Sequence, residues 1–302
     1  MLVGTLLGLA TAVIWGTGDF LSRKPSASVG SILTSVMIQP IGLLIMLVVL
    51  LASSTTDSLR TILAHPNYLA LNLGIGVIAF MGIVFLYRGY SEGIMSIVAP
   101  IAGAFPIIAV TLSIAILGVS LNFVRSASIF AAIIGILLTG VKLSSFRQLF
   151  PGGKSNDASR ERIIKGADYG VGAMIFAGIG LFGLGVVAPI IGSVLAVIVL
   201  KFSETLTASV AVLSRRVKFV KPDRTTLGWI IVIGACDAAG FVTYNLAVTS
   251  AGGSLPVVVT LAGLIGVVTI ILARAFYRER LETIQLIGVV IIFAAVAAIM
   301  YF

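Results

Sequence analysis

The residues of this sequence with the clearest potential for chemistry are a few ionisable side chains inside long apolar runs. Lys201 and Glu204 are three positions apart, so on a helix they share one face. Asp237 lies near the middle of another run, and Gln39 is polar within a third. A charged side chain at mid-membrane costs about 2.5 to 3.5 kcal/mol on insertion scales, which makes it a functional candidate by default.

Two interpretations of these residues are open. In the first, Lys201, Glu204 and Asp237 surround a cavity, where one carboxylate takes up a proton for coupling and the ammonium holds an anionic group of a substrate. In the second, the lysine and a carboxylate only neutralise each other inside a helical bundle. The spacing is compatible with both.

Aromatic and polar residues elsewhere could complete the wall of such a cavity. Trp15, Tyr87 and Tyr244 would supply aromatic faces, and Asn245 would add a polar group beside Tyr244. Aromatic residues near the end of a span more often lie in the interfacial belt, so both roles stay open for them.

Two pairs of opposite charges occur at i and i+4, where helix geometry brings side chains together. Asp19 and Arg23 end the first apolar run, and Arg88 and Glu92 follow the third. Such pairs usually anchor a helix at the membrane surface. Arg88 is also a substrate-site candidate, because a slightly longer third span would turn it inward.

Prolines predict interruptions in two of the apolar runs. Pro100 and Pro106 lie in the fourth run, and Pro256 lies at the start of the ninth. Proline has no amide hydrogen, so the carbonyl four positions earlier loses its helical partner. In a membrane such a carbonyl persists only where protein or water satisfies it, so these prolines either border a cavity or kink a helix.

Other kinds of chemistry find little support. One cysteine and one histidine cannot form a disulfide framework or a Cys/His metal site, so we expect neither a metal nor a cofactor. The four letters from Gly16 to Asp19 resemble the GxGD motif of intramembrane aspartyl proteases. Those enzymes carry a second aspartate in a Tyr-Asp pair, whereas here Cys236 precedes Asp237, so we do not expect an enzyme.

The elements that hold these residues are predicted to be membrane-spanning helices of an all-α polytopic protein. Hydrophobic residues make up 59% of the 302 residues and charged residues 10%, which excludes an ordinary soluble protein. A span needs about 20 apolar residues, and ten runs are long enough. They cover about residues 2 to 21, 29 to 52, 68 to 87, 94 to 117, 124 to 142, 168 to 188, 190 to 213, 226 to 249, 254 to 273 and 283 to 302.

The chain is predicted to consist of two similar halves. A five-helix repeat over residues 1–143 and another over residues 168–302 flank a polar linker over residues 144–167. Sliding the halves by about 160 residues aligns short matches, among them Gly30-Ser31-Ile32-Leu33 with Gly192-Ser193-Val194-Leu195. Because five is odd, the second copy must enter the membrane from the opposite side, and the two inverted repeats would enclose a central cavity.

The basic residues agree with this inverted arrangement. Seventeen of the 20 lysines and arginines lie in the odd-numbered connections between runs, and the even-numbered connections contain only Arg60 and Arg125. Positively charged connections stay in the cytoplasm, so both termini are predicted to lie outside. The net charge of +9 thus orients a membrane protein, and nucleic acid is not an expected partner.

Three short segments resemble the EamA-like family of the drug/metabolite transporter superfamily. They are the Trp15-Gly16 turn, the segment GIMSIVAPIAGAFP over residues 93–106 and the segment YRERL over residues 277–281. The resemblance extends over essentially the whole chain, with Arg278 in place of the usual glycine before Glu279. It implies ten helices around a central cavity and the export of small metabolites such as amino acids.

The function expected from the sequence is therefore secondary transport in the cell membrane. The protein would export small organic metabolites by alternating access, with protons as a candidate coupling ion. The lipid bilayer and a small-molecule substrate are the expected partners, and the protein would be a monomer or a weak homodimer. A channel or lipid-handling protein is the alternative; it predicts a continuous polar stripe through several spans, whereas polar residues here are sparse and central.

Overall fold

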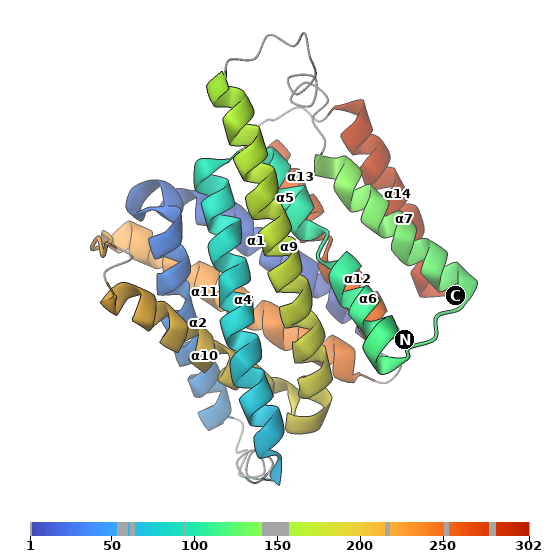
Figure 1. Ribbon diagram of the computed structural model, residues 1–302, viewed down its shortest axis with the longest axis horizontal. Coiled ribbons are helices and arrows are strands. Elements are labelled where there is room, and N and C mark those ends of the chain that lie inside the picture. The colour runs from blue at the N-terminus through green and yellow to red at the C-terminus, as the bar shows by residue number, and fades with distance from the viewer. Residues whose placement is uncertain are drawn as a thin grey trace.

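The computed structural model describes residues 2–52, 60, 64–93, 95–140, 157–214, 218–250, 254–277 and 282–301. Within these residues the regular structure is helical throughout (Figure 1). The helices are α1 (Leu2–Val29), α2 (Ser31–Ala52), α4 (Pro66–Glu92), α5 (Met95–Gly103), α6 (Pro106–Leu117), α7 (Phe123–Gly140), α9 (Asp157–Ile191), α10 (Ser193–Leu213), α11 (Arg224–Thr249), α12 (Leu255–Ala262), α13 (Ile265–Tyr277) and α14 (Thr283–Tyr301).

The described helices are long and apolar enough for a multi-pass membrane protein. Seven helical stretches qualify as membrane spans by length and composition, and one of these, Val98–Leu117, includes most of α5 and all of α6. Three shorter apolar stretches accompany them: Phe123–Thr139, Leu255–Thr269 and Thr283–Ile299. Each of the ten stretches overlaps one of the predicted runs, so the prediction of an all-helical polytopic protein is confirmed to this extent.

α1 and α9 extend furthest beyond their predicted runs. α1 continues beyond the first apolar run to Val29 and includes Arg23, so a single residue, Gly30, connects it to α2. α9 begins at Asp157, inside the predicted linker, whose residues 144–156 lie outside the described part of the chain. Polar residues can continue a helix beyond the apolar layer into water, so the length of an apolar run underestimates the length of the helix.

The two matched Gly-Ser segments have the same backbone conformation. The φ angles of Gly30 and Gly192 are 90° and 92°, in the left-handed region that glycine adopts without strain from a side chain. Each glycine separates two consecutive helices, α1 from α2 and α9 from α10. The sequence match therefore reflects the same sharp connection between consecutive helices in both halves of the chain.

The fourth and ninth apolar runs are each divided into two helices, but the breaks do not lie at Pro100 or Pro256. α5 continues through Pro100 to Gly103, and α6 begins at Pro106. Pro256 lies in the first turn of α12, where a missing amide hydrogen is tolerated, and the break to α13 follows at Gly263. Pro106 alone of the three lies directly at a break. A proline removes one helical hydrogen bond, which does not by itself end a helix.

The two halves contain helices in the same order and with the same packing. The helices α1, α2, α4, α5 with α6, and α7 are followed by α9, α10, α11, α12 with α13, and α14. α1 packs against α11 as α9 packs against α4, while α2 packs against α10 and α7 against α14. Figure 1 shows α4 beside α9 at the front of the molecule and α7 beside α14 at one end.

Glycines at matched positions allow the helices to approach closely. A Cβ atom on Gly16 of α1 would lie 2.6 Å from Cβ of Val268 in α13, and one on Gly178 of α9 would lie 2.6 Å from Cβ of Ile108 in α6. A side chain at either position would force the helices apart. A second matched pair is Gly76, which faces Ser203, and Gly234, which faces Ile41.

Some matched residues contact each other directly. Such a contact is expected on the axis of a two-fold arrangement, where a position meets its own equivalent. The pairs are Gln39 with Lys201 and Gly103 with Gly263. The first of these pairs belongs to a cluster of ionisable side chains.

Candidate functional site

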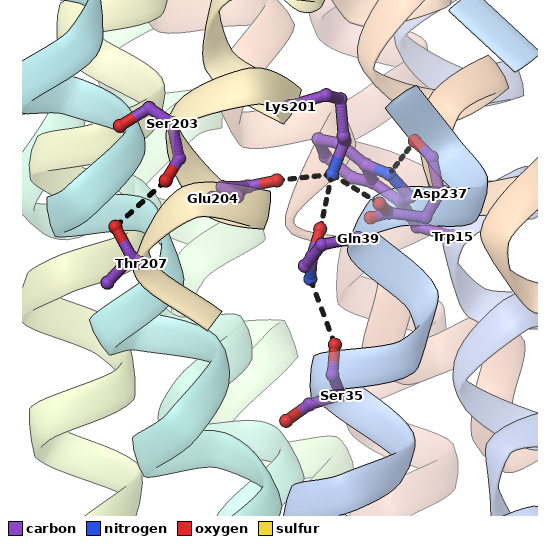
Figure 2. A network of polar contacts seen from close by, with 8 residues as sticks. All are labelled: Trp15, Ser35, Gln39, Lys201, Ser203, Glu204, Thr207 and Asp237. Atoms are coloured by element: carbon purple, nitrogen blue, oxygen red, sulfur yellow. Dashed lines mark hydrogen bonds and ion pairs between the residues drawn. The ribbon is translucent and has the colours of Figure 1, made fainter. Parts of the chain in front are cut away.

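A buried ionic cluster joins three helices between the two halves. Lys201 and Glu204 come from α10, Asp237 from α11 and Gln39 from α2 (Figure 2). The Lys201 ammonium donates to Gln39 Oε1 at 3.0 Å, to Glu204 Oε2 at 2.5 Å and to Oδ2 of Asp237. The side chains of Lys201 and Glu204 are fully buried, and that of Asp237 is 20% exposed. The structure thus brings together all four polar residues that the sequence singled out in mid-span.

The ammonium of Lys201 is satisfied by the protein itself. It carries three N–H donors, and three acceptors lie within hydrogen-bonding distance. The ring centroid of Phe241 lies 4.4 Å from Nζ, which adds a cation–π contact. In this conformation Lys201 serves as the counter-charge of the cluster and has no donor left for an anionic substrate.

Local contacts hold the cluster in this geometry. The Gln39 side-chain nitrogen donates to the Ser35 carbonyl one turn earlier at 3.3 Å, so its oxygen points toward Lys201 (Figure 2). Gly42, on the next turn of α2, leaves room for the lysine stem, because a Cβ atom there would lie 3.3 Å from Lys201 Cδ. The Trp15 indole donates to the Asp237 backbone carbonyl at 3.3 Å and connects α1 to α11.

A cavity of about 930 Å³, partly open to the outside, borders the cluster. Three carboxylates line it: Asp19 of α1, Glu204 of α10 and Asp237 of α11. Trp15 and Phe241 also line it, with ring centroids 4.9 Å apart in an edge-to-face arrangement. The remaining lining residues are Ala79, Gly82, Ile83, Leu86, Tyr90, Ala99, Ala102, Gly103, Phe105, Ala173, Ala177, Gly180, Leu181, Leu200, Ile265, Gly266 and Thr269.

One oxygen of Glu204 has no hydrogen-bond partner among the described residues. Oε2 accepts from Lys201, whereas Oε1 is buried and receives no donor from the protein. A buried polar atom without a partner costs about 1 to 3 kcal/mol, and more when it is charged. Because Glu204 lines the cavity, a group inside the cavity is the natural donor: a proton, a water molecule or a substrate.

Asp19 is the charged lining residue that sequence reasoning missed. Its spacing to Arg23 indicated an interfacial pair, but α1 continues to Val29, which places Asp19 well inside the helix. A second, smaller cavity of about 420 Å³ is lined by Asp19, Asp237 and Trp15 as well. The sequence does contain a signal for this residue, because Asp19 follows shortly after the Trp-Gly turn of an apolar run. The expected helix was shorter, however, and it placed Asp19 at the membrane surface.

Tyr244 and Asn245 connect helices, and neither lines the two cavities described here. The Tyr244 hydroxyl donates to the Leu181 carbonyl of α9 at 2.9 Å, and the ring stacks on Trp15 at a centroid distance of 6.1 Å. The Asn245 amide donates to the Ser193 carbonyl at the start of α10 at 3.0 Å. Both side chains therefore hold α11 in place next to the cavity.

Tyr87 and Arg88 are neighbours in sequence but differ in environment. Tyr87 is buried and lines the smaller cavity. Arg88 is exposed on α4 and lines neither cavity. The longer third helix therefore brings Tyr87, and not Arg88, toward the site.

A comparison with known protein families gives a match for the first half of the chain. Residues 2–141 match the model of the EamA-like transporter family. The first half of the chain is therefore similar to the EamA-like transporter family. This agrees with the resemblance seen in the sequence, and together with the apolar helices it supports a multi-pass membrane protein of the drug/metabolite transporter type.

Two further proteins are similar to this chain, one in sequence and one in fold. An uncharacterized protein of Methanocaldococcus jannaschii is 28% identical over 136 residues, which are 45% of this chain and 95% of that protein. The relative is thus about half as long as this chain. A protein with a solved crystal structure has a TM-score of 0.73 and 16% sequence identity, and the match covers 98% of this chain and 96% of that one. At this identity the match establishes similarity of fold over nearly the whole chain.

Proposed function

We propose that the protein is a secondary transporter that exports small organic metabolites, amino acids among them, by alternating access. The observation that carries the proposal is the cavity between the two halves, which three carboxylates border inside a largely apolar bundle. Ionisable residues within membrane spans mark substrate or ion pathways because their burial is otherwise unfavourable. The match of residues 2–141 to a transporter family supports the same function.

In this proposal the two halves are copies of one five-helix unit inserted in opposite senses. Support comes from the matching order of helices, from the reciprocal packing of α1 on α11 and α9 on α4, and from matched residues that contact each other. A relative of about half the length is compatible with such a unit. Rocking of one half against the other would open the cavity alternately to the two sides of the membrane.

The odd-numbered connections are proposed to face the cytoplasm, because they hold most of the basic residues. Both termini then lie outside. A tag at the amino terminus should react with a membrane-impermeant reagent in intact cells, whereas a tag inserted within residues 144–156 should react only after permeabilisation. The opposite labelling pattern would contradict this orientation.

Glu204 or Asp237 is proposed to carry the coupling proton. Both line the cavity and both contact Lys201, but one ammonium cannot neutralise these two carboxylates and Asp19 together. A proton and a substrate can therefore compete for the same negative site. Such competition makes the release of one depend on the binding of the other, which is the requirement for coupled exchange.

The test uses the neutral amide variants Glu204→Gln and Asp237→Asn in proteoliposomes, with and without a pH gradient. The variant that lacks the coupling carboxylate should lose gradient-driven transport and retain substrate exchange at saturating substrate concentration, because exchange moves no net protons. Asp223→Asn is the control, since Asp223 is exposed and caps α11 away from the cavity. Unchanged gradient dependence in both amide variants would remove the assignment.

A further inference from the structure

The wall of the larger cavity carries more negative than positive groups. Asp19, Glu204 and Asp237 line it, whereas the Lys201 ammonium is occupied by Gln39 and two of these carboxylates. No lysine or arginine is among the described residues that line this cavity. An anionic group inside it would meet carboxylates without a cation to receive it, while a cation would be attracted.

Oε1 of Glu204, which lacks a hydrogen-bond partner in the described part of the chain, offers such a cation an acceptor. Oε1 is fully buried and lacks a donor among the described residues, while Oε2 is held by Lys201, so the carboxylate of this cavity-lining residue has one acceptor position left. A charge-assisted N–H···O bond is the strongest common way to satisfy such an atom. A water molecule could occupy the position but would leave the negative charge of the wall unbalanced.

The acidic residues that line the cavity are restricted to three helices. They come from α1, α10 and α11, whereas every lining residue from α4, α5 and α9 is uncharged. The matched positions of the two halves differ in this respect: Leu181 corresponds to Asp19, and Ala79 to Asp237, and all four line the same cavity. The cavity is therefore amphipathic, with an acidic wall and an apolar wall.

Aromatic rings border the acidic wall. Trp15 and Phe241 both line the cavity, and Phe241 already has the Lys201 ammonium at 4.4 Å from its ring centroid. Aromatic faces attract cations through the negative charge above the ring. Lys201 itself thus illustrates how this environment holds an ammonium group, with carboxylates on one side and a ring on the other.

We propose that the substrates of this cavity are amphipathic organic cations, that is, amines with a compact apolar body. The ammonium group binds to Oε1 of Glu204 near Asp19, and the apolar body lies against α4, α5 and α9. This proposal rests on the proposed transport function and specifies its substrate class. A free amino acid binds less well than the corresponding amine, because its carboxylate finds no cationic partner.

The test compares three compounds with the same phenylethyl frame: phenethylamine, a cation; phenylalanine, a zwitterion; and 3-phenylpropionate, an anion. Binding to the purified protein and counterflow in proteoliposomes are measured for each at pH 7. Phenethylamine should bind at least about tenfold more tightly than phenylalanine, and phenylpropionate should show no saturable binding. Glu204→Gln should weaken phenethylamine binding about tenfold or more, and Asp223→Asn should leave it unchanged.

The outcomes separate this inference from the proposed function. Saturable counterflow of phenylalanine or phenylpropionate without counterflow of phenethylamine would overturn the cation assignment and leave the transporter proposal standing. Absence of saturable flux for all three compounds in proteoliposomes of folded protein would overturn both. The ranking of the three compounds on the unmodified protein does not depend on any variant, so a poorly folding Glu204→Gln protein would still leave the assignment open to refutation.

Discussion

Replacing Lys201 with methionine should destabilise the protein strongly, although methionine is apolar and of similar length. The change removes the only ammonium that contacts Glu204 and Asp237 among the described residues. Two negative groups would then face each other inside an apolar bundle without a counter-charge. The predicted loss of stability is caused by the uncompensated negative charge of the two carboxylates, and not by a change in side-chain volume.

The magnitude can be worked from the burial of the two carboxylates. Removing one partner of a buried ion pair costs about 3 to 5 kcal/mol, because the other charge is left uncompensated. Glu204 is fully buried, whereas Asp237 is 20% exposed toward the cavity and can recover part of its hydration. Glu204 therefore carries most of the cost, and we expect a loss near the lower end, about 3 kcal/mol.

The assay is reversible unfolding in mixed micelles at pH 7, applied to the unmodified protein, Lys201→Met, Glu204→Gln and the double variant. Glu204→Gln alone should lose about 1.5 kcal/mol, because one charge-assisted hydrogen bond becomes a neutral one. The double variant should be more stable than Lys201→Met alone, since the amide needs no counter-charge. The four proteins form a cycle from which the coupling between the two side chains is obtained.

Two results would refute the reasoning. An unfolding midpoint of Lys201→Met equal to that of the unmodified protein would mean that the ammonium does not neutralise the cluster. Alternatively, the loss in the double variant could equal the sum of the single losses. The two side chains would then act independently, and Lys201 would not be the counter-charge of Glu204.

Two further predictions concern packing. Gly16→Ala should destabilise the protein or prevent its folding, because the new Cβ would lie 2.6 Å from Cβ of Val268, whereas Gly74→Ala, in the same kind of helix with nothing within 4 Å, should retain or slightly raise the unfolding midpoint. Tyr244→Phe should cost about 1 kcal/mol in the same unfolding assay, because the Leu181 carbonyl loses a buried hydrogen bond, and an unchanged midpoint would mean that water replaces the hydroxyl.

Much of the helical layout could be predicted from the sequence. Apolar runs of about 20 residues identify membrane spans because a backbone in lipid must satisfy its own hydrogen bonds. The Gly30 and Gly192 connections were found as a sequence match because only glycine adopts their φ angles without strain. Lys201, Glu204, Asp237 and Gln39 were found together because polar side chains are rare in such runs.

Other features depended on contacts that no local pattern contains. Asp19 was assigned to the membrane surface because the end of an apolar run does not reveal how far a helix continues. Of the predicted helix breaks, only the one at Pro106 was found, and the break at Gly263 escaped prediction because it lies where matched helices meet, and not at Pro256. Whether a residue lines the cavity depends on which neighbouring helix covers it.

The amino-acid sequence by itself determined that this protein crosses a membrane as helices and which few charged residues it retains there, since both follow from the cost of exposing polar groups to lipid. Only the tertiary structure decided that the three donors of Lys201 are taken by its neighbours, that one oxygen of Glu204 has no donor among the described residues, and that Asp19 lines the same cavity as Glu204. The physical reason is that hydrogen bonds and charge balance depend on distances between helices far apart in the chain, and packing sets those distances.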